Sequence, residues 1–159
     1  MSFQVRDAVP KDVPQILDCI QELAVFEKEP DAVSITEETL LEYGFGTHPL
    51  YKCFVAEENQ EILGIALVYF RFSTWKGRTV HLEDLIVRQS HRGKGIGSAL
   101  YRRVMDYANT ENVGRVEWAV LNWNQPAIDF YTKTGADVLD DWRTVQMSKE
   151  KLRIYIDKK

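Results

Sequence analysis

One segment in the middle of the chain constrains the fold more than any other. An apolar strand that ends at Val87 leads into a turn with three glycines between residues 93 and 97, and a helix begins at once. The helix is predicted because residues 96, 100, 104 and 108 are apolar and fall on one face. A further strand is predicted over residues 115–121. This order of strand, turn, helix and strand predicts a right-handed βαβ crossover.

The rest of the chain predicts an α/β fold with a mixed central sheet, in which an antiparallel N-terminal meander joins the βαβ unit and helices flank both. Its β-rich runs predict strands near residues 3–5, 53–56, 62–72 and 79–87. A helix is predicted over 13–24 with Asp12 as its cap, and a second from a capping box at 34–37 to residue 41. Further elements are predicted as a helix over 126–134, a strand over 142–147 and a polar C-terminal helix. No repeat or linker interrupts the pattern, so we expect a single domain over residues 1–159.

The composition excludes several classes of protein. A formal net charge of −4 gives no support to nucleic-acid binding. No apolar run reaches the length of a membrane span, and the first residues lack the apolar stretch of a signal peptide, so a cytoplasmic location is expected. The three histidines match no ligand spacing, and no metal is expected. Cys19 and Cys53 lie in apolar segments and are predicted to be reduced core residues.

The glycine turn is suited to a phosphate or pyrophosphate. Glycines let the backbone approach a ligand closely, and the amides at a helix start lie at the positive end of its dipole. Arg92 and Lys94 add positive charge. The Walker A pattern is absent, and the dinucleotide pattern G-x-G-x-x-G fails because Ser98 stands at the third glycine position. The remaining pattern is Arg92-x-x-Gly95-x-Gly97.

That pattern, after an Ile-Val strand end, resembles the pyrophosphate-binding motif of the GNAT superfamily of N-acetyltransferases. A second signature downstream, Asn124-x-x-Ala127-x-x-x-Tyr131 followed by Gly135, is similar to the same superfamily's second motif. Within the superfamily, the chain resembles the spermidine/spermine acetyltransferases at Glu27 and at residues 42–46, 82–84 and 123–124. The segment of residues 73–79 looks more like the thialysine-acetylating branch. The resemblance covers residues 3 to about 147. It departs near 140–142, where the relatives carry a longer acidic insertion.

The resemblance implies a GNAT fold and acetyl-CoA as co-substrate. It implies that the backbone of Leu85, Ile86 and Val87 bonds the pantetheine arm like an added strand. The pyrophosphate would be held at the turn, by Arg92, Gly93, Lys94, Gly95, Ile96, Gly97 and Ser98. Asn124, Ala127 and Tyr131 would contact the cofactor from the second signature.

The chemistry needs an acid for the leaving sulfur and a base for the amine. By the resemblance, Tyr131 is the candidate acid, since a phenol beside the sulfur protonates it as it leaves. An alkylammonium with a pKa near 10.4 must lose a proton before it attacks, and a carboxylate accepts it. Strand alternation puts Glu83 and Asp84 on opposite faces, so only one should reach the site, and the resemblance selects Glu83.

The remaining expectations concern the substrate and partners. The family uses the position of Glu27 to hold the distal amine of the substrate. His81 falls on the Glu83 side of the strand and would line the pocket, and Asp141, or Asp140 beside it, is a further candidate carboxylate. The substrate would be a small di- or polyamine or a lysine analogue such as thialysine. A homodimer is expected from the family. A protein or peptide N-acetyltransferase and a non-catalytic acyl-CoA-binding regulatory module stay open as alternatives.

Overall fold

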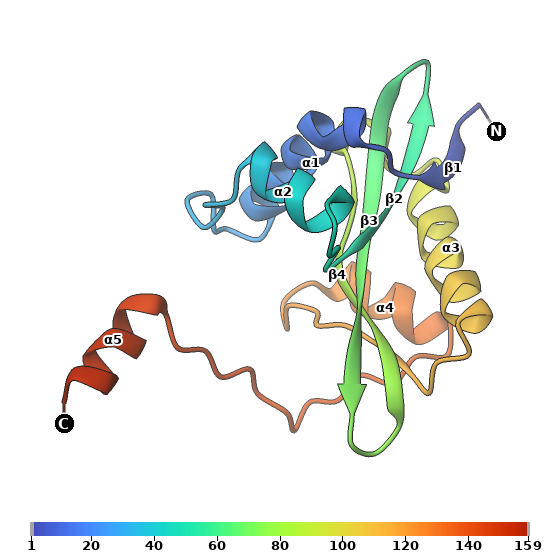
Figure 1. Cartoon of the computed structure of the whole chain (residues 1–159). Helices are drawn as coiled ribbons and strands as arrows, with labels where there is room; N and C mark the ends of the chain where they lie inside the picture. Colours follow the sequence, from blue (N-terminus) through green and yellow to red (C-terminus); the bar gives the residue numbers. More distant parts are fainter. Residues whose placement is uncertain (1, 159) are drawn as a thin grey trace. The chain divides into compact units, whose positions relative to one another are not determined.

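The computed structural model describes residues 2–158, which form two compact units. The first unit ends at Ala119 and the second begins at Val120. The first contains one five-stranded sheet with the strands in sequence order (Figure 1). Its strands are β1 (Gln4–Asp7), β2 (Lys52–Glu58), β3 (Glu61–Ser73), β4 (Gly77–Val87) and β5 (Val116–Glu117). β1 to β4 pair antiparallel, and β5 pairs with β4 in parallel. The predicted mixed sheet with an N-terminal meander and a βαβ unit is therefore confirmed.

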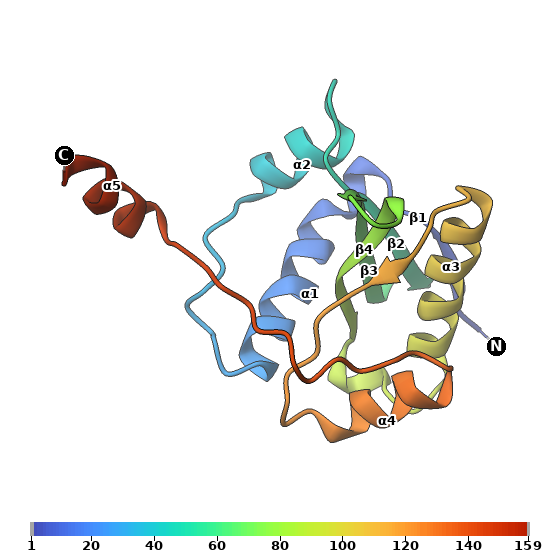
Figure 2. The same cartoon turned by 90° about the horizontal axis from the view of Figure 1, so that it is seen from below.

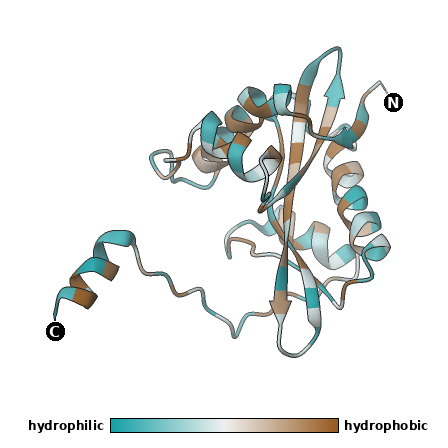
Figure 3. Cartoon of the chain, in the orientation of Figure 1, coloured by the Kyte–Doolittle hydropathy of each residue, from teal (hydrophilic) through white to brown (hydrophobic). Residues whose placement is uncertain are grey.

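Helices cover both faces of this sheet. α1 (Val13–Phe26) and α2 (Glu37–Phe45) pack with one face, and α3 (Ile96–Thr110) packs on the other, as Figure 2 shows from below. The central strands are apolar on both faces because helices cover both, and Figure 3 shows the long apolar stretch of β3. Two core clusters result, one around Ile16, Val55 and Ile65 under α1, and one around Phe54 and Leu100 under α3.

Both cysteines lie in the cluster under α1. Cys19 and Cys53 are free thiols, 0% and 4% exposed. Burial raises the pKa of Cys19 to about 11 and raises that of Cys53 further, so both stay protonated at neutral pH. The prediction that they are core residues is confirmed.

A β-bulge interrupts β4 within Leu82-Glu83-Asp84. Val68 of β3 faces Leu82, and the next residue back, Leu67, faces Asp84, so Glu83 is the extra residue on the bulged strand. A bulge of this kind breaks the alternation of side chains. His81 and Asp84 face the α1 side, because their partners Tyr69 and Leu67 lie on that side of β3.

The caps of α1 and α2 differ in detail from the prediction. Asp12 stands at the cap position of α1, but its side chain makes no cap hydrogen bond; its Oδ2 accepts from the amide of Val9 at 2.9 Å and from Arg6 at 2.7 Å. α2 is capped by Thr36, whose Oγ1 accepts from the amide of Thr39 at 3.3 Å, and not by a box that begins at Ser34. Ser34 lies before the helix, in a stretch without regular structure.

The second unit contains α4 (Gln125–Lys133) and α5 (Lys149–Asp157). α4 confirms the predicted helix, and Gly135 after it has a φ of +92°, a conformation that glycine adopts without strain. The strand predicted over 142–147 is wrong, because those residues have no strand pairing in the structure. The strand predicted over 115–121 is reduced to Val116–Glu117. Apolar alternation identifies residues that can form a strand, but pairing partners decide whether they do.

Candidate active site

The glycine turn between β4 and α3 has a conformation that two of its glycines require. Gly93 and Gly95 have φ angles of +77° and +80°, in the left-handed region, and a Cβ at either would meet nothing within 4 Å. Backbone conformation, not crowding, therefore selects glycine there. Gly97 differs, because its φ is not left-handed and an added Cβ would meet only Val87 Cγ2 at an ordinary 3.5 Å. Among residues 2–158, neither backbone conformation nor a close contact requires glycine at position 97.

The first turn of α3 presents donors that its own helix cannot satisfy. The first amide to bond within the helix is that of Ala99, which donates to the carbonyl of Gly95 at 3.0 Å. The amides of Ile96, Gly97 and Ser98 precede it and have no helical acceptor. With the positive end of the helix dipole, they form a place suited to an anionic group.

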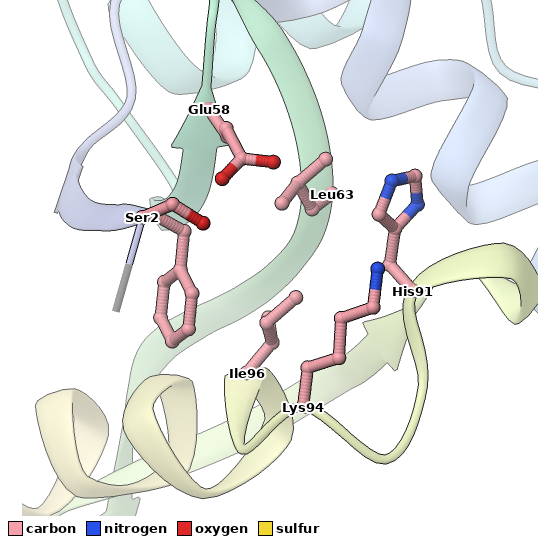
Figure 4. Close-up of a pocket in the computed structure, with 7 residues that line it drawn as sticks. Ser2, Glu58, Leu63, His91, Lys94 and Ile96 are labelled. Atoms are coloured by element: carbon pink, nitrogen blue, oxygen red, sulfur yellow. The ribbon is translucent and has the colours of Figure 1, made fainter.

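The two cations of the turn have different surroundings. Arg92 fixes the loop: its Nε donates to the carbonyl of Val87 at 3.0 Å, and its guanidinium lies 5.1 Å from the ring centre of Phe26. Lys94 lines a small pocket with His91 and Glu58, beside the start of α3 (Figure 4). Because the carbonyl of Val87 is already bonded to Arg92, it is the least available of the backbone groups expected to bind pantetheine.

The edge of β4 beyond its contact with β5 is open. β5 pairs with β4 only at Val80 and His81, and among residues 2–158 no strand pairs with Leu85, Ile86 or Val87 on that side. An unpaired strand edge offers backbone donors and acceptors to an extended ligand. The structure thus combines such an edge with the anion-binding turn at its end.

Glu83 is held by side chains of β3 and β4. Tyr69 donates from its hydroxyl to Oε2 of Glu83 at 2.8 Å, and Nε2 of His81 lies 3.4 Å from the same oxygen. On the other side of the imidazole, Nη1 of Arg71 lies 3.2 Å from Nδ1 of His81. A guanidinium only donates, so Nδ1 is the acceptor, and the proton of a neutral His81 is on Nε2, facing Glu83. Arg71 also pairs with Glu117 at 2.6 Å.

Three carboxylates in this region influence one another. The pKa of Glu27, at the end of α1, is raised by burial and by the charge of Glu83. The pKa of Asp84 is raised to about 6 by burial and by the charges of Glu83 and Glu27. The pKa of Glu83 is lowered by the hydrogen bond from His81, then by that from Tyr69. Glu27, Glu83 and Asp84 therefore form one acidic cluster. The surroundings disfavour the charged forms of Glu27 and Asp84, whose pKa values are raised, and favour the charged form of Glu83, whose pKa is lowered.

The structure corrects the expectation that only one of Glu83 and Asp84 reaches this side of the sheet. The bulge at Glu83 breaks the alternation, so the two adjacent carboxylates share the face that α1 covers. His81 contacts Glu83, as the sequence predicts. The structure therefore brings together Glu27, His81 and Glu83 from the predicted set, and it adds Asp84, which the alternation argument had dismissed.

The second unit holds the other predicted site residues. The Oδ1 atom of Asn124 accepts from the amide of Ala127 at 3.4 Å and caps α4, so this side chain has a structural task. Tyr131 lies on the same helix, with its ring 5.5 Å from that of Phe130. Its backbone carbonyl accepts from Thr134. Asp141 is exposed in a turn after α4.

The fold and the geometry of the site agree with the chain's match to a protein family. The model of the acetyltransferase (GNAT) family matches residues 16–136, about three quarters of the chain. The chain belongs to the GNAT family of acetyltransferases. The matched range includes Glu27, the acidic cluster, the glycine turn and Tyr131. GNAT enzymes use acetyl-CoA, so the chain is an acetyl-CoA-dependent N-acetyltransferase. The non-catalytic alternative is not supported.

Individual relatives place the chain within the family. It is 39% identical to the thialysine N-epsilon-acetyltransferase of Bos taurus, over 96% of this chain and 97% of that protein. It is 36% identical to the spermidine/spermine N(1)-acetyltransferase-like protein 1 of Homo sapiens, over 94% of this chain but 23% of that longer protein. The chain is therefore close to the thialysine and polyamine acetyltransferases.

Solved structures agree on the fold. An integron cassette protein from the mobile metagenome of V. cholerae matches with a TM-score of 0.80 and 26% identity, over 100% of this chain and 99% of that one. A predicted acetyltransferase from Clostridium acetobutylicum, solved with acetyl-CoA, matches with a TM-score of 0.73 and 20% identity, over 91% and 96% of the two chains. This second likeness supports the fold alone.

Residues 2–158 contain neither a candidate membrane span nor a candidate metal site. None of the helices described is long and apolar enough to cross a membrane. In the same part of the chain, no three His, Cys, Asp or Glu side chains are grouped as metal ligands would be.

Three residues of the site could not be placed there from the sequence. Tyr69 and Arg71 lie on β3, whose sequence pattern predicts a strand but no site role. Their contacts depend on the register of β3 against β4. Asp84 was visible beside Glu83, but its placement depends on the bulge. A strand pairing is a long-range property, and local periodicity carries no signal for its register.

Proposed function

We propose that the protein transfers the acetyl group of acetyl-CoA directly to a primary amine of a small di- or polyamine or of a lysine analogue such as thialysine. The observation that carries this proposal is the acidic cluster of Glu27, Glu83 and Asp84, beside the open edge of β4. Burial and, after it, repulsion between the carboxylates raise the pKa of Glu27 and Asp84, and a bound ammonium would relieve that repulsion. The 39% identity to a thialysine acetyltransferase supports the same class of substrate.

The chain's own residues fit acetyl-CoA as co-substrate. The unpaired amides of Ile96, Gly97 and Ser98 would hold the pyrophosphate, with the left-handed Gly93 and Gly95 shaping the loop. The free space at Gly97 supports this assignment, because a close approach of ligand explains a glycine that the protein itself does not require. Lys94 would add charge, and Arg92 would keep the loop in place.

The pantetheine arm would lie along the open strand edge. The backbone of Leu85, Ile86 and Val87 would bond it as an added strand, with the carbonyl of Val87 the weakest contributor. Asn124 and Ala127, at the start of α4, would complete the cofactor contacts. Bound there, acetyl-CoA supplies the acetyl group and a thiolate leaving group.

The residues of the site would handle the protons of the reaction. Tyr131 would donate its phenolic proton to the leaving sulfur, as the family resemblance implies. Glu83 would hold the substrate ammonium and favour its deprotonation, with His81 and Tyr69 fixing its carboxylate. Glu27 would bind the distal cation of the substrate. Asp141 would be an additional carboxylate for a longer substrate.

The choice between a polyamine and thialysine depends on the cations near the cluster. Thialysine carries a carboxylate, which an acidic pocket repels unless a cation balances it. Arg78 is not suited to that task, because it pairs with Glu111 at 3.2 Å. Arg71 is better placed, since it contacts His81, although Glu117 already neutralises it. A preference for thialysine would assign its carboxylate to Arg71.

The test is thiol release from acetyl-CoA by the purified protein with spermidine, spermine, putrescine, thialysine, lysine and an unrelated peptide. Turnover on a small diamine or on thialysine, but not on the peptide, is the expected result. Turnover on the peptide alone would favour a protein N-acetyltransferase. Failure on every acceptor, with acetyl-CoA bound, would refute the substrate class. A cytoplasmic homodimer remains part of the proposal, and sedimentation equilibrium tests its stoichiometry.

A further inference from the structure

The bulge in β4 places two adjacent carboxylates on one face of the sheet. In a regular strand Glu83 and Asp84 would point to opposite faces. Here Asp84 continues a cross-strand row with Leu67 of β3 and Cys53 of β2, both in the apolar cluster under α1. Glu83 contacts Tyr69 and His81, which belong to the same face. The reacting amine can therefore meet two carboxylates and not one.

The surroundings of Glu83 and Asp84 differ, so the two carboxylates are suited to different roles. Glu83 is half-exposed and receives a hydrogen bond from Tyr69, with His81 close to the same oxygen. These donors stabilise its charged form. Within residues 2–158, the Asp84 side chain makes no hydrogen bond or ion pair. It lies at the end of an apolar row, facing the charges of Glu27 and Glu83.

The groups that face Asp84 come from each neighbouring element. They are Glu27 at the end of α1, Cys53 of β2, Tyr69 of β3, and His81 and Glu83 of β4. His81 is engaged with Glu83, and within residues 2–158 no cation pairs with Asp84. Together with burial, the two nearby carboxylates raise its pKa to about 6. When two acids in one site have pKa values that are pushed apart, the one with the higher value is suited to exchanging protons at neutral pH.

We propose that Asp84 accepts the proton of the substrate ammonium, while Glu83 stays ionised and orients that ammonium. This division of roles rests on the proposed function. In that proposal Glu83 alone both holds the ammonium and favours its deprotonation, whereas here Asp84 takes the second role. The bulge makes the division possible, because it brings both carboxylates to the side that α1 covers. Tyr69 and His81 act as positioning residues for Glu83.

The transfer begins with the loss of one proton from the substrate ammonium. One N–H bond of the ammonium breaks, its electron pair stays on nitrogen, and an O–H bond forms on Asp84, which later releases that proton to water. The nitrogen pair then forms the C–N bond to the acetyl carbon, and the C–S bond breaks with its pair on sulfur. The sulfur takes a proton from Tyr131, which regains one from the second N–H of the nitrogen. The third hydrogen stays in the amide.

The kinetic test compares Asp84→Asn with Glu83→Gln, and uses Asp106→Asn on the exposed side of α3 as a matched control. For wild type, kcat/KM for the amine, which reports the free enzyme, should rise with pH through about 6 and then level off. Asp84→Asn should lower kcat by about 10²–10⁴-fold and abolish the inflection in kcat/KM. Glu83→Gln should raise KM by at least about tenfold and keep the inflection but move it to lower pH, because the charge of Glu83 contributes to the raised pKa of Asp84. The control should change neither.

A second measurement does not depend on turnover. A carboxyl whose folded-state pKa is raised destabilises the protein when it ionises, so wild type loses stability as pH rises from its unfolded pKa to the folded value. Asn at position 84 carries no such penalty. The melting temperature of Asp84→Asn should therefore exceed that of wild type at pH 8, by a margin that shrinks towards pH 4.5. This also shows that the variant folds.

The outcomes separate this proposal from the proposed function. Retention of kcat and of the kcat/KM inflection in Asp84→Asn would overturn the division of roles. Loss of the inflection in Glu83→Gln would also overturn it and would make Glu83 the base. An equal melting temperature for wild type and Asp84→Asn at every pH would contradict a half-buried Asp84 whose charge costs stability. A wild type that acetylates no amine would refute the proposed function itself.

Discussion

The two kinds of glycine in the turn before α3 predict opposite effects of the same substitution. Gly95→Ala forces an alanine to a φ of +80°, which costs about 1–2 kcal/mol of stability. For a chain of this size that lowers the melting temperature by roughly 3–6 °C. Gly97→Ala meets no such strain, since its Cβ finds only Val87 Cγ2 at 3.5 Å. Within the first turn of α3 alanine is favoured, so stability should hold or rise by about 0.5 kcal/mol.

Gly97→Ala, which should leave stability intact, should weaken the binding of acetyl-CoA. The Cβ of an alanine at 97 would stand beside the end of β4, over the amides proposed to bind the pyrophosphate. Loss of one hydrogen bond to a charged phosphate, worth about 1.5–3 kcal/mol, weakens Kd roughly 10- to 150-fold. Gly97→Ala should thus be a stable protein with poor affinity for acetyl-CoA. Calorimetric melting and isothermal titration measure the two quantities independently.

Gly77→Ala supplies the matched control. Gly77 has a φ of +75° and equally open surroundings, but it is the first residue of β4, directly after the turn from β3. It should lose as much stability as Gly95→Ala with no change in Kd for acetyl-CoA. A Gly97→Ala protein that melts several degrees below wild type, or that binds acetyl-CoA as tightly, would show that glycine at 97 serves packing and not the ligand.

Three further substitutions test other parts of the molecule. Arg6→Met should cost about 2–4 kcal/mol in urea unfolding, because it strips the partner from Asp12, whose side chain is 4% exposed. Burial opposes the charge of Asp12, but Arg6 outweighs it and lowers the pKa, so the stabilisation is present above about pH 4 and the two proteins should converge as pH falls below it. Tyr131→Phe should reduce kcat about 10²-fold or more and leave Kd for acetyl-CoA within about twofold, and an unchanged kcat would exclude it as the acid. Tyr69→Phe removes a hydrogen bond to Glu83, so KM for the amine should rise about three- to tenfold at pH 6 with little change in kcat, and an equal KM would contradict the positioning role.

Much of the fold was predictable because it depends on local patterns. The long alternating runs became β3 and β4, and the four-residue recurrence of Ile96, Leu100, Val104 and Ala108 became the buried face of α3. The glycine turn was predictable for the same reason, since few local structures need left-handed residues directly before a helix. The strand predicted over 142–147 failed because alternation gives a segment the ability to pair but supplies no partner.

The acidic cluster shows where sequence reasoning reaches its limit. Glu83 and Asp84 were both visible as candidates, and period-two alternation then separated them onto opposite faces. That inference is sound for a regular strand, but one extra residue in β4 reverses it, and the extra residue exists only relative to β3. The contacts of Tyr69 and Arg71 depend on the same register. Local sequence therefore predicted the candidate carboxylates, whereas strand register decides which of them share the face that α1 covers.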